Sequence, residues 1–141
     1  MPDQKLSEKE ISKLYSDAYP PASATISNET PSADNIHIIQ FACKFIYDDG
    51  TNDNEGGNVD VPPGGQYTLT AHYSGCCRGY VVVAQVRFND GSTQTVGNTA
   101  TTPAGYCGGN VLWHIRLQTM RKQGTPTSAQ NVELWCDPPM A

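Results

Sequence analysis

The residues with the most distinctive chemistry in this 141-residue chain are five cysteines, which fall into two groups. Cys43 and Cys136 alternate with apolar residues in strand-like segments, so we expect both on inward faces. On different strands they could form an inter-sheet disulfide or remain buried thiols that pack as small apolar groups. The other three, Cys76, Cys77 and Cys107, lie in glycine-rich segments. One of the adjacent pair could bond to Cys107 and leave a thiol able to bond another chain, whereas a reducing compartment would keep all five as thiols.

No cysteine spacing indicates a zinc site or a catalytic nucleophile. The chain has no C-x-x-C, and two adjacent cysteines are not the usual spacing of structural zinc ligands. A nucleophilic cysteine needs a nearby histidine base. The three histidines, His37, His72 and His114, are expected as half-exposed strand residues. A metal site of two histidines and a carboxylate could be assembled from such residues, but no H-x-H or H-E-x-x-H motif indicates one. Phosphate-binding and nucleophile-elbow motifs are also absent from the sequence. We therefore expect no catalytic residues and a protein that is not an enzyme.

Residues 48–58, DDGTNDNEGGN, are acidic and glycine-rich, and we expect them to form a loop. Calcium takes six to eight oxygen ligands, which this composition could supply. The spacing does not fit a calcium-loop motif, because Gly50 or Thr51 falls where an oxygen ligand should be. The alternatives are a solvated turn and a calcium site, and no other cofactor is expected. The candidate calcium ligands are Asp48, Asp49, Asp53 and Glu55.

Two aromatic residues outside the expected core could contact a ligand. Tyr106 lies in a glycine-rich loop, and Trp135 alternates with the apolar residues of the last strand-like segment. Exposed aromatic side chains often mark contacts with proteins, glycans or lipids. The alternative is that these rings cover the ends of the fold.

The elements that position these residues are β-strands, and the clearest is GYVVVAQVRFNDGS, residues 79–92. Tyr80, Val82, Ala84 and Val86 alternate with more polar positions, and the Asn-Asp-Gly that follows is a strong hairpin signal. Similar segments lie around residues 36–47, 66–73, 92–96, 111–118 and 131–136. Short strands at regular spacing predict an all-β protein, an antiparallel β-sandwich or jelly-roll-like domain.

The first 19 residues predict a short α-helix. Ser7 and Glu10 have the spacing of a capping box, and Leu6 with Ile11 that of a hydrophobic staple. The proline-rich residues 20–35 then predict an extended connector, with at most a short edge strand at 25–27, and residues 36–141 form the sandwich. A helix this short is marginal alone, so its apolar stripe needs a partner. The residues expected to contact that partner are Leu6, Ile11, Leu14 and Tyr15.

Composition narrows the classes of partner. The net charge of −5 and the pI of about 4.9 argue against nucleic-acid binding. No apolar run is long enough for a transmembrane segment. The first ten residues are polar and lack the apolar region of a secretory signal, and the sequence alone does not assign the protein to a cellular compartment.

We therefore expect a non-catalytic structural subunit that associates with itself as a homo-oligomer, coat, filament or virion-type assembly, through an N-terminal arm that contacts neighbouring copies. The alternative is a released protein that binds glycans or membranes, of a lectin or cytolysin type. Its ligand end would be formed by residues 74–79, residues 98–110 and the acidic segment. Both readings favour an assembled particle or an extracellular location.

Overall fold

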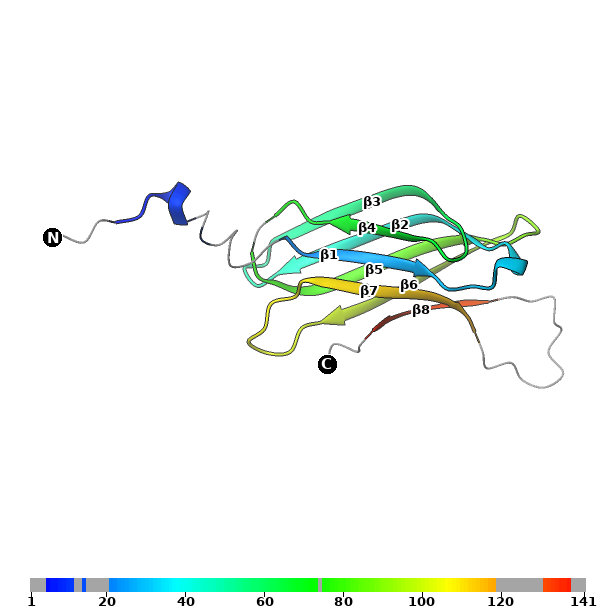
Figure 1. Cartoon of the computed structure of the whole chain (residues 1–141). Helices are drawn as coiled ribbons and strands as arrows, with labels where there is room; N and C mark the ends of the chain where they lie inside the picture. The colour runs from blue at the N-terminus through cyan, green and yellow to red at the C-terminus, as the bar shows by residue number, and fades with distance from the viewer. Residues whose placement is uncertain (1–4, 12–13, 15–20, 74, 119–130, 138–141) are drawn as a thin grey trace.

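The computed structural model describes residues 5–11, 14, 21–73, 75–118 and 131–137, and the strands from residue 23 onward form two packed β-sheets (Figure 1). Within these residues the chain contains eight strands and one short 3₁₀ turn. They are β1 (Ser23–Asn28), η1 (Ser32–Asp34), β2 (His37–Tyr47), β3 (Asn52–Val61), β4 (Gln66–Thr70), β5 (Cys77–Arg87), β6 (Thr93–Thr101), β7 (Asn110–Leu117) and β8 (Val132–Asp137). The all-β sandwich expected from the sequence is confirmed.

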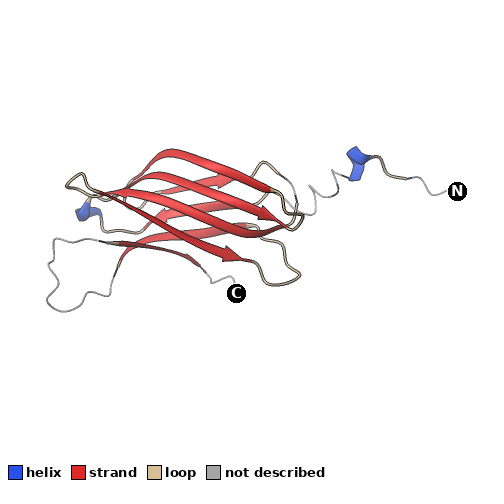
Figure 2. Ribbon diagram, turned by 180° about the vertical axis from the view of Figure 1, so that it is seen from behind, coloured by secondary structure: helices blue, strands red, loops and turns tan. Residues whose placement is uncertain are grey.

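Each sheet has four strands. Sheet A has the order β4-β1-β7-β8, and sheet B has the order β3-β2-β5-β6. Neighbouring strands are antiparallel except β1 and β7, which run parallel in the middle of sheet A. The two sheets face each other as two layers (Figures 1 and 2), and their inner faces form the core. The largest buried side chains of this core are Trp113, Tyr80, Phe41 and Phe45.

Strand β5 has the alternation that the sequence predicts. Tyr80, Val82, Ala84 and Val86 are fully buried. The Asn-Asp-Gly turn then reverses the chain into β6, with Gly91 at a φ of 88°, a left-handed conformation that glycine adopts without strain. Strand β6 extends to Thr101, beyond the expected end of the returning strand at residue 96.

The segment expected as a connector over residues 20–35 contributes a strand to the sandwich. Strand β1 lies inside sheet A, between β4 and β7, and not at an edge. Ala24 and Ile26 are fully buried, and so is Asn28, whose side chain bonds to surrounding backbone. The sequence did not reveal this strand clearly, because Ile26 is the one large apolar side chain in β1 and its other residues are small or polar.

The expected acidic loop over residues 48–58 is also corrected. Residues 52–61 form β3, the edge strand of sheet B, and only the turn before it is irregular. The strand was missed because it has just two apolar side chains, Val59 and Val61, at its far end. Backbone pairing with β2 holds it in place, and Gly56 allows close approach, since a Cβ there would lie 2.5 Å from the Cα of Ala42.

The capping box at the N-terminus is present in the described residues. The Ser7 amide donates to Glu10 Oε1 at 3.0 Å, and the Glu10 amide donates to Ser7 Oγ at 3.1 Å. Residues 8–11 and 14 are helical, and they lie apart from the two sheets (Figures 1 and 2). Tyr15, expected on the same apolar stripe, lies outside the described residues. No helix among the described residues is long and apolar enough to cross a membrane.

Candidate functional site

Three connections lie at one end of the sandwich and carry five of the sequence-predicted site residues, Asp48, Asp49, Cys76, Tyr106 and Cys107. They are the turn 48–51, the segment 71–76 and the loop 102–109, which join β2 to β3, β4 to β5 and β6 to β7. The described chain before β1 leaves from the same end, where the Ser23 amide donates to the Gly109 carbonyl and the Ala71 amide to the Ala22 carbonyl. We call this region the disulfide end.

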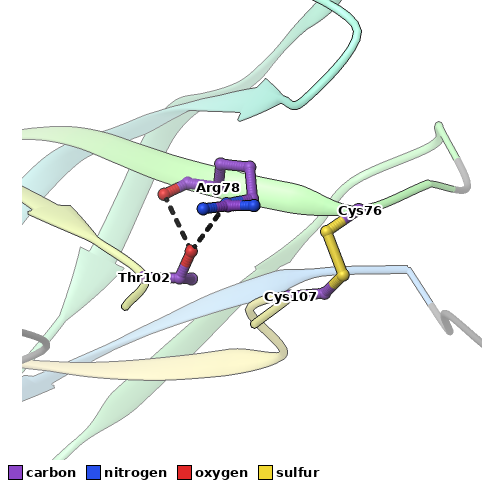
Figure 3. Close-up of a disulfide and its surroundings, with 4 residues drawn as sticks. All are labelled: Cys76, Arg78, Thr102 and Cys107. Carbon is purple, nitrogen blue, oxygen red and sulfur yellow. Dashed lines mark hydrogen bonds between the residues drawn. A yellow bond between two sulfur atoms is a disulfide. The ribbon is translucent and has the colours of Figure 1, made fainter. Parts of the chain in front are cut away.

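A disulfide between Cys76 and Cys107 ties the loop before β7 to the start of β5 (Figure 3). Beside it, Arg78 Nε donates to Thr102 Oγ1 at 3.1 Å, and the Gly108 amide donates to the Cys77 carbonyl at 2.7 Å. The expectation that one of the adjacent cysteines pairs with Cys107 is therefore confirmed. The bond fixes the loop that carries Tyr106.

The other three cysteines are thiols. Cys43 on β2 and Cys136 on β8 belong to different sheets, as expected, but they do not form an inter-sheet disulfide. Both are free thiols, which is the other alternative that the sequence left open. Cys77, left over from the adjacent pair, is fully buried. Burial raises the pKa of the Cys43 thiol to about 12 and also raises the pKa of Cys77. Thiolates, the reactive form, are therefore suppressed at both positions.

The first two calcium candidates have structural roles in the turn before β3. Asp49 accepts hydrogen bonds from the Thr51 amide and hydroxyl at 2.8 and 2.5 Å, and from the Tyr73 hydroxyl at 2.6 Å. These donors, the Thr51 side chain foremost, lower the pKa of Asp49 to about 2. The Asp48 amide donates to the Cys76 carbonyl. The turn is thereby joined to both neighbouring segments of the disulfide end.

The other two candidates, Asp53 and Glu55, converge with His72. Asp53 Oδ2 accepts the amides of His72 and Tyr73 at 2.5 and 3.3 Å, and His72 Nδ1 lies 2.6 Å from Glu55 Oε2. One ligand atom from each residue lies within 4.8 Å of the others. The sequence predicted His72 only as a half-exposed strand histidine. It follows β4 by two residues and lies 17 residues from Glu55 along the chain, a separation that gives no sign of their contact.

Electrostatics stabilise the charged forms in this cluster. Burial opposes ionisation of Asp53, but the backbone amide of His72 and the other donors outweigh it, and the pKa of Asp53 is lowered. The hydrogen bond with Glu55 raises the pKa of His72. Glu55 keeps a side-chain exposure of 20%, whereas His72 is 83% exposed and able to reorient.

The two candidate aromatics have different surroundings. Tyr106 is 68% exposed at the disulfide end, in agreement with its expected place in a loop. Trp135 lies on β8, away from that end, where it stacks on His114 at 4.6 Å between ring centroids and lies under the Arg116 guanidinium. Glu29 bonds both His114 and Arg116. His114 is buried, not half-exposed as expected, because Trp135 covers it, and Trp135 is only half-buried by these contacts.

The chain matches no family model, no curated protein and no solved structure in our comparisons.

Proposed function

We propose that this chain is a non-catalytic structural subunit that associates with itself, with its N-terminal helix contacting a neighbouring copy. The observation that carries the proposal is the exposure of the apolar stripe on that helix. Leu6, Ile11 and Leu14 are 49%, 42% and 55% exposed, although the capping box fixes the start of the helix. A preformed apolar stripe that does not pack on its own sandwich is suited to burial against a second molecule.

We assign a hollow on the outer face of sheet B as the surface that receives this stripe. It has a volume of about 260 Å³ and includes Ala42, Gly57 and the 44%-exposed Val83. Ala42 and Val83 are direct partners across β2 and β5, so two small apolar side chains form the middle of the face. Amide side chains border it, with Gln40 bonded to Asn58.

Residues 5–10 carry Lys5 and Lys9 as well as Glu8 and Glu10, so their charges balance and the pairing depends on apolar burial. Association would bury the exposed half of three apolar side chains. At about 1 kcal/mol for each of them, this burial contributes roughly 3 kcal/mol to the free energy of association. That free energy corresponds to about 100-fold in association.

The test is the mass of the full chain in solution over a range of concentrations, measured by sedimentation velocity or light scattering. The triple variant L6S/I11S/L14S is expected to weaken association about 100-fold. The matched control K5S/K9S, on the same helix, is expected to leave it unchanged. Val83→Glu should weaken association, while Thr99→Glu, on an exposed position of neighbouring β6, should not. A strict monomer at every concentration, with all variants alike, would refute the proposal.

A second candidate function is the binding of a glycan or lipid surface by the disulfide end. The candidate is supported by the turn 48–51 and the loop 102–109, which both lie at this end, and by the exposure of Tyr106 and Tyr73. Glycan-array and liposome-sedimentation assays, each with and without calcium, test this function. Tyr106→Ser should abolish binding, whereas Tyr67→Ser, which removes an exposed tyrosine of β4, should not. Binding in neither assay would eliminate this candidate.

A further inference from the structure

We propose that Asp53, Glu55 and His72 bind one divalent transition-metal ion, of the zinc type, at the edge where the two sheets meet. The site lies outside the two surfaces proposed for self-association, so metal binding here does not depend on the proposed function.

The backbone brings the three side chains together from two strands of different sheets. Asp53 and Glu55 are two residues apart on β3 and therefore share a face of the strand. That face is the less exposed one, directed toward the neighbouring edge strand β4 of sheet A. His72 comes two residues after the end of β4. An ion held here would join the open edges of both sheets.

The distances suit metal coordination after a small movement. The three ligand atoms lie within 4.8 Å of one another. Ligands of a tetrahedral ion at about 2.1 Å from the metal are roughly 3.4 Å apart. The 2.6 Å contact between His72 Nδ1 and Glu55 Oε2 must therefore open by about 0.8 Å. Rotation of the His72 ring, which is 83% exposed, provides that movement without shifting the backbone.

Asp53 holds the segment in position for this movement. Its Oδ2 atom accepts the backbone amides of His72 and Tyr73, so the carboxylate that would bind the ion also fixes the start of the segment that carries the histidine. Sites whose ligands are already oriented by further hydrogen bonds lose less entropy when the ion binds.

The charge of the cluster supplies an independent reason for a cation. Asp53 and Glu55 are both only partly exposed, and among the described residues neither forms an ion pair with a lysine or arginine. The amides of His72 and Tyr73 stabilise the Asp53 carboxylate, but a neutral His72 leaves two formal negative charges side by side. A divalent cation does balance them.

The donor set indicates the class of ion. An imidazole nitrogen with two carboxylates suits zinc and related first-row ions, and three protein ligands leave a position open for water or another ligand. Calcium requires six to eight oxygens, more than two carboxylates can supply. The chain also contains a natural comparison: His37 Nδ1 lies 2.7 Å from Asp60 Oδ1, but among the residues that the structure describes this pair has no third ligand beside it.

The test uses the tag-free, chelator-treated full chain, titrated with Zn²⁺ in competition with a chromogenic chelator. One ion should bind per chain. Because removal of one of three ligands typically costs at least as much as loss of a supporting contact, His72→Asn should lower the affinity at least about 10-fold. His37→Asn and Cys136→Ser should leave the zinc affinity unchanged. The second control tests whether the partly exposed Cys136 thiol contributes to binding.

The metal-free His72→Asn variant should be as thermally stable as the unchanged chain, because the His72 side chain is exposed. Equal stability would show that the loss of zinc affinity does not come from unfolding. Glu55→Gln provides a second ligand variant and should also lower the affinity. The proposal is overturned if no ion binds, if His72→Asn binds zinc like the unchanged chain, or if His37→Asn loses as much affinity. Displacement of zinc by equimolar calcium or magnesium would likewise overturn it.

Discussion

The side chain of Asn28 should be one of the main determinants of stability in this fold. It is fully buried, and its amide donates to the carbonyls of Ile36 and Val61, both at 2.9 Å. Its Oδ1 accepts the Thr30 amide at 3.1 Å and the Thr30 hydroxyl at 2.6 Å. One side chain thus joins the end of β1 to the end of β3 and to the segment before β2.

Replacing Asn28 by alanine removes four hydrogen bonds and leaves their buried partners without replacements. At about 1 kcal/mol for each bond, the free energy of unfolding should fall by about 4 kcal/mol. Such a loss is a large part of the 5–15 kcal/mol typical of a domain. Asn28→Asp should be at least as destabilising, because an anionic oxygen would replace the donor that faces two carbonyl oxygens.

Urea unfolding with the disulfide intact measures this effect. For a slope near 2 kcal/mol per molar urea, the midpoint of Asn28→Ala should fall by about 2 M. The control is Asn58→Ala, an exposed amide on β3 bonded to Gln40, which should change the free energy of unfolding by less than about 0.5 kcal/mol. If Asn28→Ala changed stability by less than 1 kcal/mol, or no more than the control, the reasoning about the buried amide would be refuted.

Three further predictions concern backbone and sulfur chemistry. Gly56→Ala should lower the free energy of unfolding by at least about 2 kcal/mol, because φ is +143° and the added Cβ would lie 2.5 Å from backbone atoms of β2. The control is the adjacent Gly57→Ala, whose added Cβ has no atom within 4 Å and should change the urea midpoint little. Reducing the disulfide, which spans 31 residues, should lower the free energy of unfolding by about 3.7 kcal/mol, and an unchanged midpoint under reducing conditions would contradict this. Cys43 and Cys77 should not react with a thiol reagent at pH 8 until urea unfolds the chain, since burial raises both thiol pKa values; rapid labelling of either, located by mass spectrometry, would show that it is accessible.

The sequence predicted elements well where side-chain burial determines the fold. Tyr80 to Val86 alternate because one face of β5 packs in the core, and the turn after it requires glycine at Gly91. Both features are local, so they can be recognised without knowing the partner strands. The capping box at Ser7 is local in the same sense and is present.

Elements stabilised by distant backbone pairing were harder to predict. Strand β3 has little apolar surface of its own, and its place depends on pairing with β2. Strand β1 looked like a connector because its neighbours, β4 and β7, begin about 40 and 85 residues later. The cluster with His72 was missed for the same reason: its spacing in the sequence gives no sign of contact, which arises only when the edges of the two sheets meet.

The parallel pairing of β1 with β7 has a consequence for how the chain reaches its native state. Ser23 pairs with Asn110, 87 residues further along the chain, so β1 cannot gain its second neighbour until that segment has been synthesised. Sheet B, made largely of successive hairpins, has no such delay. Because distant pairings slow folding, a ribosome-bound chain would complete β2, β3, β5 and β6 first, while β1 waits with one side unpaired. During that interval the unpaired side of β1 would be open to pairing with a strand of a neighbouring chain.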